Sequence, residues 1–189
     1  MKKFIIMGLP RSGTTYLMTL LNSHPNIVCH GEMYNPYAII EDKRRDQTQP
    51  AVVRRDANAL RFFKKSFENY GSKKPEDLNA IGFKFMIGHN IDVLRKSIAS
   101  AEDITLIYVH RDNKLAQAAS LFRALETKNW AQTKPADEFQ PIEHGPMRLS
   151  HRIHEMATMD FLFAEWFAGL GHAKKTSFEY RELFASGFE

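Results

Sequence analysis

Short apolar runs alternate with longer amphipathic stretches along most of the chain. The apolar runs are rich in β-branched and aromatic residues and are bounded by turn residues or charge, and they predict strands at 4–9, 26–30, 81–87, 104–110 and 175–180. Apolar residues at helical spacing predict a helix that begins at Ser12 or Gly13, and others at about 54–69, 90–99, 113–128 and 147–169. This alternation predicts an α/β fold with a central parallel sheet and helices on both faces.

Two stretches interrupt the pattern, and composition adds little to it. Residues 41–56 are polar and charged and predict a loop, and 71–79 predicts a linker. A chain of 189 residues has the length of one domain, so we expect a single domain over 1–189. The net charge of +4 and the pI near 9.1 favour an anionic partner and leave open nucleic acid, acidic glycans and phosphorylated cofactors.

Cysteine content and segment length exclude several classes of protein. The single cysteine, Cys29, excludes an internal disulfide and a cysteine-based zinc cluster, and we expect it to be a small apolar residue at a strand end. The N-terminal apolar run ends at Gly8 and leads directly into a loop, which favours a buried strand over a signal peptide. No segment has the length of a membrane span, so we expect a cytoplasmic protein.

The loop after the first strand, GLPRSGTT, predicts an anion site. Gly8 to Thr15 spells GxxxxGTT between a strand and a helix, so backbone N–H groups and the positive end of the helix dipole face one point. A nucleotide-triphosphate loop carries a lysine where this chain has Thr14, and here the cation is Arg11. His110 and Arg111 follow the fourth strand in place of a magnesium-binding aspartate, so we expect no metal.

PRSGTTYL followed by LNSHPNI resembles the phosphate loop of sulfotransferases that use 3′-phosphoadenosine 5′-phosphosulfate (PAPS). The resemblance implies a P-loop-like fold in which Arg11 holds the 5′-phosphate and its bridging oxygen. It also implies that the anion cradle is formed by Ser12, Gly13, Thr14 and Thr15. The similarity covers residues 4 to about 184, with FEYREL similar to a late family segment, and is weakest over 35–80, where acceptor specificity is usually built.

A second motif, HRDNKLAQAASLFRALETKNW over 110–130, looks like the segment that grips the 3′-phosphate. It is most similar to bacterial carbohydrate sulfotransferases of the trehalose-sulfotransferase-like type, and Arg111 and Ser120 are the matching residues. The usual spacing is eight positions, whereas Ser120 lies nine after Arg111 and position 119 is Ala. Either the turn carries an extra residue or a different donor replaces one of the pair.

The general base is expected in CHGEMYNP, residues 29–36. Glu32 follows the second strand, at the edge where open α/β sheets place their crevice, and trehalose-type enzymes use a Glu in the corresponding place. His30 and His89 are the alternatives, with His30 favoured for a structural role. Lys84 matches a Lys of bacterial relatives and is expected to meet the sulfuryl group or the acceptor.

The remaining basic clusters, Lys43-Arg44-Arg45 and Arg54-Arg55, are expected at the solvated surface, with attraction of an anionic acceptor or cofactor as the alternative.

Together these features imply transfer of a sulfuryl group from PAPS to a hydroxyl of a carbohydrate or glycolipid. The expected partners are a small-molecule or glycan acceptor, without nucleic acid or stable membrane insertion, and a homodimer is left open. A P-loop kinase or nucleotide triphosphatase is one alternative, disfavoured by Thr14 and the missing magnesium ligand. A non-catalytic binder of phosphorylated nucleotide or sulfated glycan is another. Family members usually continue past position 189 with a loop that closes over the donor, so a minimal enzyme, a fragment and an inactive relative all stay open.

Overall fold

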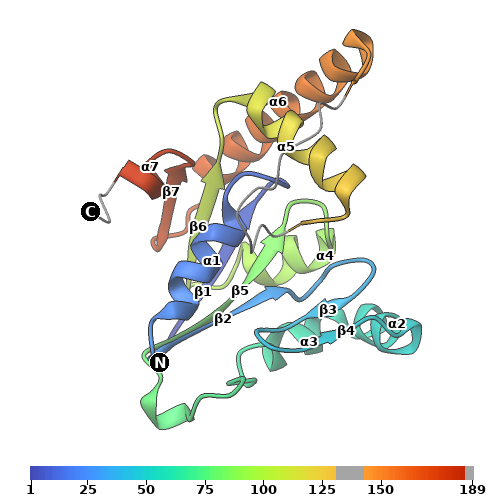
Figure 1. The fold of residues 1–189 in the computed structure, drawn as a ribbon. Coiled ribbons are helices and arrows are strands. Elements are labelled where there is room, and N and C mark those ends of the chain that lie inside the picture. The colour runs from blue at the N-terminus through green and yellow to red at the C-terminus, as the bar shows by residue number, and fades with distance from the viewer. Residues whose placement is uncertain (131–142, 186–189) are drawn as a thin grey trace.

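A five-stranded parallel sheet forms the centre of the molecule in the computed structural model, which describes residues 1–130 and 143–185. The strands are β1 (Lys2–Gly8), β2 (Ile27–Glu32), β5 (Ala80–Met86), β6 (Ile104–His110) and β7 (Lys175–Glu179). Their order is β2-β5-β1-β6-β7, so the first strand lies in the middle (Figure 1). In this register Gly8 lies beside Met86 on one side and Val109 on the other. The predicted α/β fold is confirmed.

Side chains alternate along β1 and divide the core into two layers. Ile5 and Met7 point to one face, which is covered by α3 (Ala59–Lys65), α4 (Ile91–Val93) with the π-helical turn η2 (Leu94–Ile98), and α6 (Pro146–Gly169). Phe4 and Ile6 point to the other face, which is covered by α1 (Thr14–Ser23) and α7 (Glu182–Ala185). Both faces of the sheet are therefore buried, as parallel sheets require.

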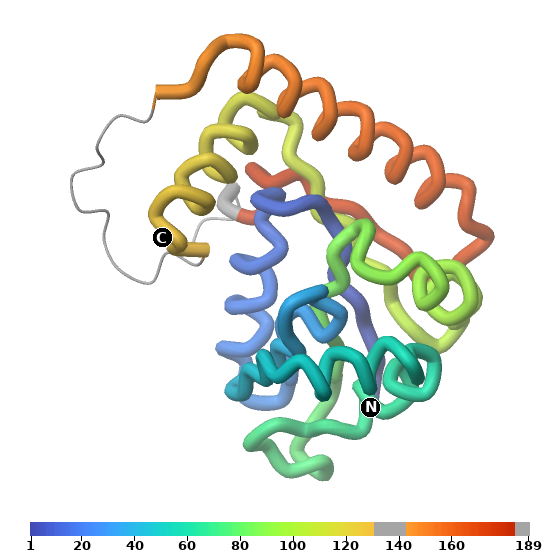
Figure 2. Tube along the Cα trace, turned by 90° about the vertical axis from the view of Figure 1, so that its right-hand side faces the viewer, coloured from blue at the N-terminus to red at the C-terminus, as the bar shows by residue number. Residues whose placement is uncertain are grey.

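The helix α5 (Lys114–Thr127) packs against α6 rather than directly on the sheet. Figure 2 shows α6 as a long helix that extends from beside α5 along one side of the molecule. The buried contact consists of Ala118, Leu121, Phe122 and Met156. The predicted helices at 113–128 and 147–169 are confirmed, and Leu115 of α5 is 56% exposed because it does not lie on the face that meets α6.

The segment before β5 differs from the prediction. The predicted loop at 41–56 is wrong, because β3 (Ile39–Ile40) and β4 (Arg45–Asp46) form an antiparallel pair and α2 (Gln49–Ala57) follows. The predicted helix at 54–69 is two helices, α2 and α3, which are separated at Asn58, where the backbone leaves the helical region. A short 3₁₀ turn, η1 (Pro75–Asp77), interrupts the predicted linker.

Burial in the same segment corrects one prediction on side chains. Phe63 and Phe67 are buried and Leu60 is 42% exposed. Arg55 is only 3% exposed, so the prediction that both arginines of the Arg54-Arg55 pair lie at the solvated surface is wrong for one of them. The reason is a set of backbone carbonyls that Arg55 meets in the interior.

Parallel strands bring four chain reversals to one edge of the sheet. The segments after β1, β2, β5 and β6 carry Arg11, Asn35, His89 and Arg111, and Glu32 ends β2 itself. Open α/β sheets bind ligands at this carboxyl edge, beside the strand where the connections change direction. No helix within 1–130 and 143–185 is both long and apolar enough to cross a membrane.

Candidate functional site

The turn between β1 and α1 has a backbone that few side chains tolerate. A methyl group at Gly8 would lie 2.5 Å from the Val109 carbonyl oxygen, so the loop packs directly on β6. Arg11 has φ 66° and Gly13 has φ 104°, both in the left-handed region. Gly13 precedes α1, and no side chain caps the helix there. The first N–H groups of α1 therefore face outward without intrahelical acceptors, as an anion cradle requires.

Two of the predicted cradle side chains point into the protein. Ser12 is fully buried, its hydroxyl has no partner within the described chain, and its N–H donates to the Leu9 carbonyl at 3.3 Å. Thr14 is 2% exposed, and its hydroxyl donates to the Met86 sulfur at 3.9 Å. Only the backbone N–H groups of residues 13–15 are therefore left as donors for an anion at this loop, and the position of the nucleotide-triphosphate lysine, Thr14, lies in the core.

Arg11, Arg111 and Ser120 meet in the folded protein. The Arg11 Nε donates to the Ser120 hydroxyl at 2.9 Å, and its Nη1 donates to the Trp130 carbonyl at 2.5 Å. The Arg111 Nη1 donates to the Arg11 carbonyl at 3.5 Å. The nine-position spacing is accommodated because α5 begins only at Lys114, so Ser120, and not the exposed Ala119, faces the loop.

The charges around Arg11 are of one sign. Burial lowers the pKa of Arg11, Arg111 and Arg123 lower it further, and Tyr180 opposes them. The Arg111 guanidinium lies 4.2 Å from the centre of the Tyr180 ring, a cation–π contact. No carboxylate in the described parts of the chain pairs with Arg11 or Arg111. Positive charges that converge in this way favour an anion between them.

Glu32 lies at the end of β2, at the same edge of the sheet as the loop that carries Arg11. Its Oε1 lies 2.9 Å from Lys84 Nζ on β5, because the parallel register places the two residues side by side. The Asn35 Nδ2 donates to the other carboxylate oxygen at 2.7 Å. Burial raises the pKa of Glu32, but Lys84 and the Asn35 hydrogen bond outweigh it, and the pKa lies below its ordinary value of 4.5. Glu32 is therefore ionised at neutral pH.

Lys84 connects Glu32 to the phosphate loop. Its Nζ also donates to the Thr15 hydroxyl at 2.8 Å, and Thr15 belongs to the first turn of α1. The side chain of Lys84 is only 7% exposed, so both contacts form in a low-dielectric region, where electrostatic interactions are stronger than in water. The ammonium group thus holds the carboxylate and the anion cradle in one arrangement.

The two histidine alternatives differ in their surroundings. His89 Nδ1 accepts from the Met86 N–H at 3.4 Å, which assigns the proton to Nε2, 3.7 Å from the Glu32 carboxylate. Burial lowers the pKa of His89 to about 4, so the ring is neutral. His30 is fully buried, and its ring nitrogens meet the Asn69 carbonyl at 2.7 Å and the Asp42 N–H at 3.1 Å. His30 is thus held in the interior by two backbone groups, as expected of a structural residue, and Glu32 and His89 stay the candidates for the base.

The model of the sulfotransferase family matches residues 3–183. The chain belongs to this family. Nodulation protein H of Rhizobium tropici is 28% identical over 159 residues, which cover 80% of this chain and 55% of the relative. Nodulation protein H of Rhizobium meliloti (strain 1021) is 26% identical over 144 residues, or 73% and 53% of the two chains. The chain thus spans about half the length of the curated relatives it matches.

A solved structure shares the fold of this sulfotransferase-family chain. The crystal structure of a sulfotransferase from Alicyclobacillus acidocaldarius superimposes with a TM-score of 0.52 at 12% sequence identity. The match covers 98% of this chain and 76% of that one. At this identity the likeness concerns the arrangement of strands and helices, which includes the parallel sheet and its carboxyl edge.

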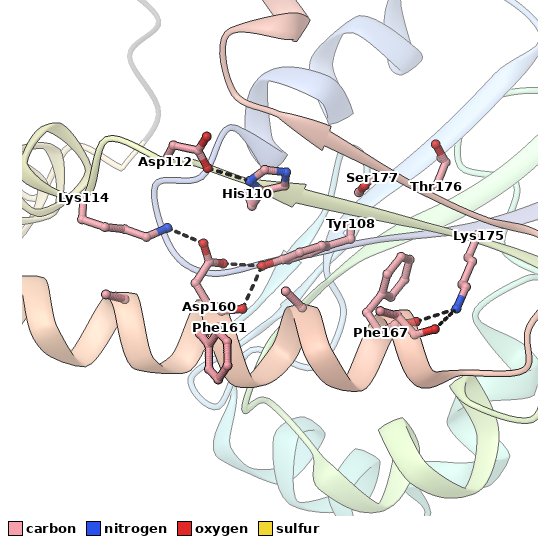
Figure 3. A pocket seen from close by; sticks show the side chains of 13 residues that line it. Tyr108, His110, Asp112, Lys114, Asp160, Phe161, Phe167, Lys175, Thr176 and Ser177 are labelled. Carbon is pink, nitrogen blue, oxygen red and sulfur yellow. Dashed lines mark hydrogen bonds and ion pairs between the residues drawn. The ribbon is translucent and has the colours of Figure 1, made fainter.

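One groove of the protein lies outside the loop after β1, and none of residues 8–15 lines it. It encloses about 580 Å³ between α6 and the strands β6 and β7 (Figure 3). Asp160 of α6 accepts hydrogen bonds from the Tyr108 hydroxyl and from Lys114, so the polar side chains at its centre satisfy one another.

Sequence inspection alone did not assign Asn35, Tyr180 and Arg123 to the site. Asn35 lies in the quoted CHGEMYNP segment and Tyr180 in FEYREL, but neither pattern says which side chain points to Glu32 or Arg111. Within the residues that the structure describes, no three His, Cys, Asp or Glu side chains gather as metal ligands would. The metal-free site stays a prediction.

Proposed function

We propose that the chain transfers a sulfuryl group from PAPS to a hydroxyl of a carbohydrate or glycolipid acceptor. The observation that carries the proposal is the meeting of Arg11, Arg111 and Ser120 beside the uncapped end of α1, with the Glu32 carboxylate nearby on β2. Family membership supports the class of reaction. The donor rests on the fit of these residues, and the acceptor class rests on the resemblance of residues 110–130 to bacterial carbohydrate sulfotransferases.

The residues fit a donor with two separate phosphate groups. The N–H groups of residues 13–15 and Arg11 would hold the 5′-phosphosulfate, and Arg111 with Ser120 would hold the 3′-phosphate. Arginine suits both positions because its planar guanidinium is permanently charged and binds phosphate oxygens in pairs. Burial and the like charges of Arg111 and Arg123 lower the pKa of Arg11. A bound anion would offset the repulsion among these charges.

The proposed reaction moves one proton and one sulfuryl group. The acceptor oxygen forms a bond to sulfur, and the bond between sulfur and the bridging oxygen of the 5′-phosphate breaks, leaving its electron pair on that oxygen. Glu32 accepts the hydroxyl proton, since it is ionised and lies near the loop through Lys84 and Thr15. Arg11 and the α1 N–H groups stabilise the charge that develops on the leaving oxygen more than the charge present before transfer.

The kinase alternative has less support from the structure. A triphosphate loop needs a lysine ammonium that reaches the terminal phosphates, whereas Thr14 at that position is buried against Met86. Arg111 and Ser120 would form a second phosphate site. A nucleoside triphosphate has no 3′-phosphate and would leave that site unoccupied.

Ligand-dependent melting tests the donor. Adenosine 3′,5′-bisphosphate without magnesium is expected to raise the melting temperature, because it binds only the folded state, and ATP with magnesium is expected to raise it much less. Arg111→Ala is the matched variant and should lose the stabilisation. An equal or larger effect of ATP would overturn the donor assignment.

Sulfuryl transfer from radiolabelled PAPS to a panel of neutral and acidic oligosaccharides tests the reaction. A product that depends on Glu32 is the expected result. Binding of the bisphosphate without transfer to any sugar, lipid-linked sugar or small alcohol would favour a non-catalytic binder.

A further inference from the structure

Arg55 is a buried cation that lies outside the proposed phosphate sites. It lies in the last turn of α2, its side chain is 2% exposed, and its Nη1 donates to the carbonyl oxygens of Met33, Asn35 and Ala38 at 3.2, 2.8 and 3.1 Å. Its Nε and Nη2 donate to the two carboxylate oxygens of Asp56 at 2.9 and 3.1 Å. One guanidinium thus joins α2 to the whole turn that follows β2.

That turn closes with backbone hydrogen bonds of its own, from the Asn35 N–H to the Glu32 carbonyl at 3.1 Å and from the Ala38 N–H to the Asn35 carbonyl at 3.2 Å. Residues 33–38 leave the sheet after Glu32, so their carbonyl oxygens lie beyond the hydrogen-bond ladder of β2 and β5. Buried carbonyl oxygens need hydrogen-bond donors. Arg55 donates to three of them in a segment where no neighbouring strand does. A buried charge is expensive unless it is paired, and here Asp56 supplies the counter-charge. The arrangement therefore holds the turn in one conformation.

The turn carries the side chain that orients Glu32. The Asn35 Nδ2 donates to Glu32 Oε2 at 2.7 Å, and its Oδ1 accepts from the Tyr37 N–H at 2.9 Å. Both ends of the Asn35 amide are thus engaged, one by the carboxylate and one by the same turn. Because the Asn35 carbonyl is itself an acceptor of Arg55, movement of the guanidinium would move the amide that holds the carboxylate.

We propose that Arg55 is a positioning residue for the reaction, which holds residues 33–38 so that Asn35 fixes the direction of the Glu32 carboxylate. The inference rests on the proposed function, in which Glu32 is the base. It assigns a role to an arginine with no place at the phosphate sites. It also explains why one arginine of the Arg54-Arg55 pair is buried and the other exposed.

Titration of the Glu32 carboxyl carbon by NMR tests the proposal in the full chain without any acceptor. Asn35→Ala removes a hydrogen bond to the charged form, so the midpoint should move to higher pH. Arg55→Met should move it in the same direction, and the double variant should move it no further than Asn35→Ala does. Arg54→Met, a change of the exposed neighbour, is the matched control and should leave the midpoint in place.

The double variant separates positioning from a direct effect of charge. If Arg55→Met shifts the Glu32 midpoint further in the Asn35→Ala background, Arg55 acts on Glu32 through its charge and the proposal fails. An unchanged midpoint in a folded Arg55→Met protein also overturns it. Should that variant not fold, Arg55→Gln, which also removes the charge but keeps a side chain that can donate hydrogen bonds, takes its place under the same two criteria.

Turnover distinguishes this proposal from the function on which it rests. With an acceptor found in the oligosaccharide panel, kcat of Arg55→Met should fall about tenfold to a hundredfold, as expected for a misplaced reacting group. The affinity for adenosine 3′,5′-bisphosphate should not change, because the hydrogen bonds of Arg55 go to Asp56 and to residues 33–38 and not to residues 8–15. If Arg55→Met shifts the Glu32 midpoint but leaves kcat unchanged, Arg55 positions Glu32 and Glu32 is not the base.

Discussion

The two ends of the site balance their charges in different ways. At the proposed acceptor end Glu32 is paired with Lys84, hydrogen-bonded by Asn35 and flanked by a neutral His89. At the proposed donor end Arg11 lies near Arg111 and Arg123 and has no paired carboxylate in the described parts of the chain. Glu32 therefore has its counter-charge within the protein, whereas an anion would supply one to Arg11. Donor binding should therefore stabilise the protein more than acceptor binding does.

The largest expected effect comes from removing the charge at the acceptor end. Glu32→Gln should lower the rate of sulfuryl transfer by about 10²–10⁴-fold, because the base is lost, while the bisphosphate should bind nearly as before. Single-turnover assays and melting curves with adenosine 3′,5′-bisphosphate measure the two effects. If Glu32→Gln keeps full turnover and His89→Ala loses it, the base is His89.

At the donor end, Arg11→Ala and Arg11→Gly should both lower the rate by about 10²–10³-fold and abolish stabilisation by the bisphosphate. They should differ in the free energy of unfolding without ligand. Arg11 has φ 66°, which costs a residue with a Cβ about 1 kcal/mol, so the glycine variant should be the more stable of the two. Urea denaturation measures the difference. Equal stability would show that the loop relaxes when the side chain is removed.

The pH dependence of Lys84→Met sharpens the comparison. In the native protein the pKa of Glu32 lies below 4.5, so Glu32 adds stability above that pH and loses it as the pH falls through its folded pKa. Without Lys84 the raising effect of burial remains and the main lowering effect is gone, so the pKa rises. The acid limb of kcat/KM should move to higher pH, whereas the exposed Lys96→Met should leave it unchanged. An unchanged acid limb of kcat/KM in Lys84→Met would mean that Lys84 does not act on the base.

The smallest expected effect concerns the spacing in α5. Ser120→Ala removes one hydroxyl that contacts Arg11 and should weaken bisphosphate binding several-fold, as the loss of about 1 kcal/mol implies. Isothermal titration calorimetry measures this. Adding Ala119→Ser, which restores the usual family spacing, should not recover affinity, because position 119 is exposed. Recovery would show that the donor approaches α5 from another side.

Local patterns predicted most of the sheet and the long helices but not the segment from 39 to 65. The five strands of the sheet are short runs of apolar and β-branched residues, so neighbours in sequence suffice to identify them. The helix α2 has a polar sequence, and what holds it is the contact of Arg55 with three carbonyls from another part of the chain. A local pattern contains no trace of such a contact, so this stretch resembled a loop.

The anion loop was foreseeable from residues 8–15 alone, because its glycines, its turn and the start of α1 are contiguous and act through the backbone. The side chains that contact this loop could not be predicted from these residues. Arg11 and Ser120 are 109 positions apart, and Lys84 and Thr15 are 69 apart. Their meeting depends on the strand order β2-β5-β1-β6, which places the ends of distant strands side by side. The resemblance to known sulfotransferases named candidates for the site, and only the packing of the sheet and its helices decided which of their side chains touch.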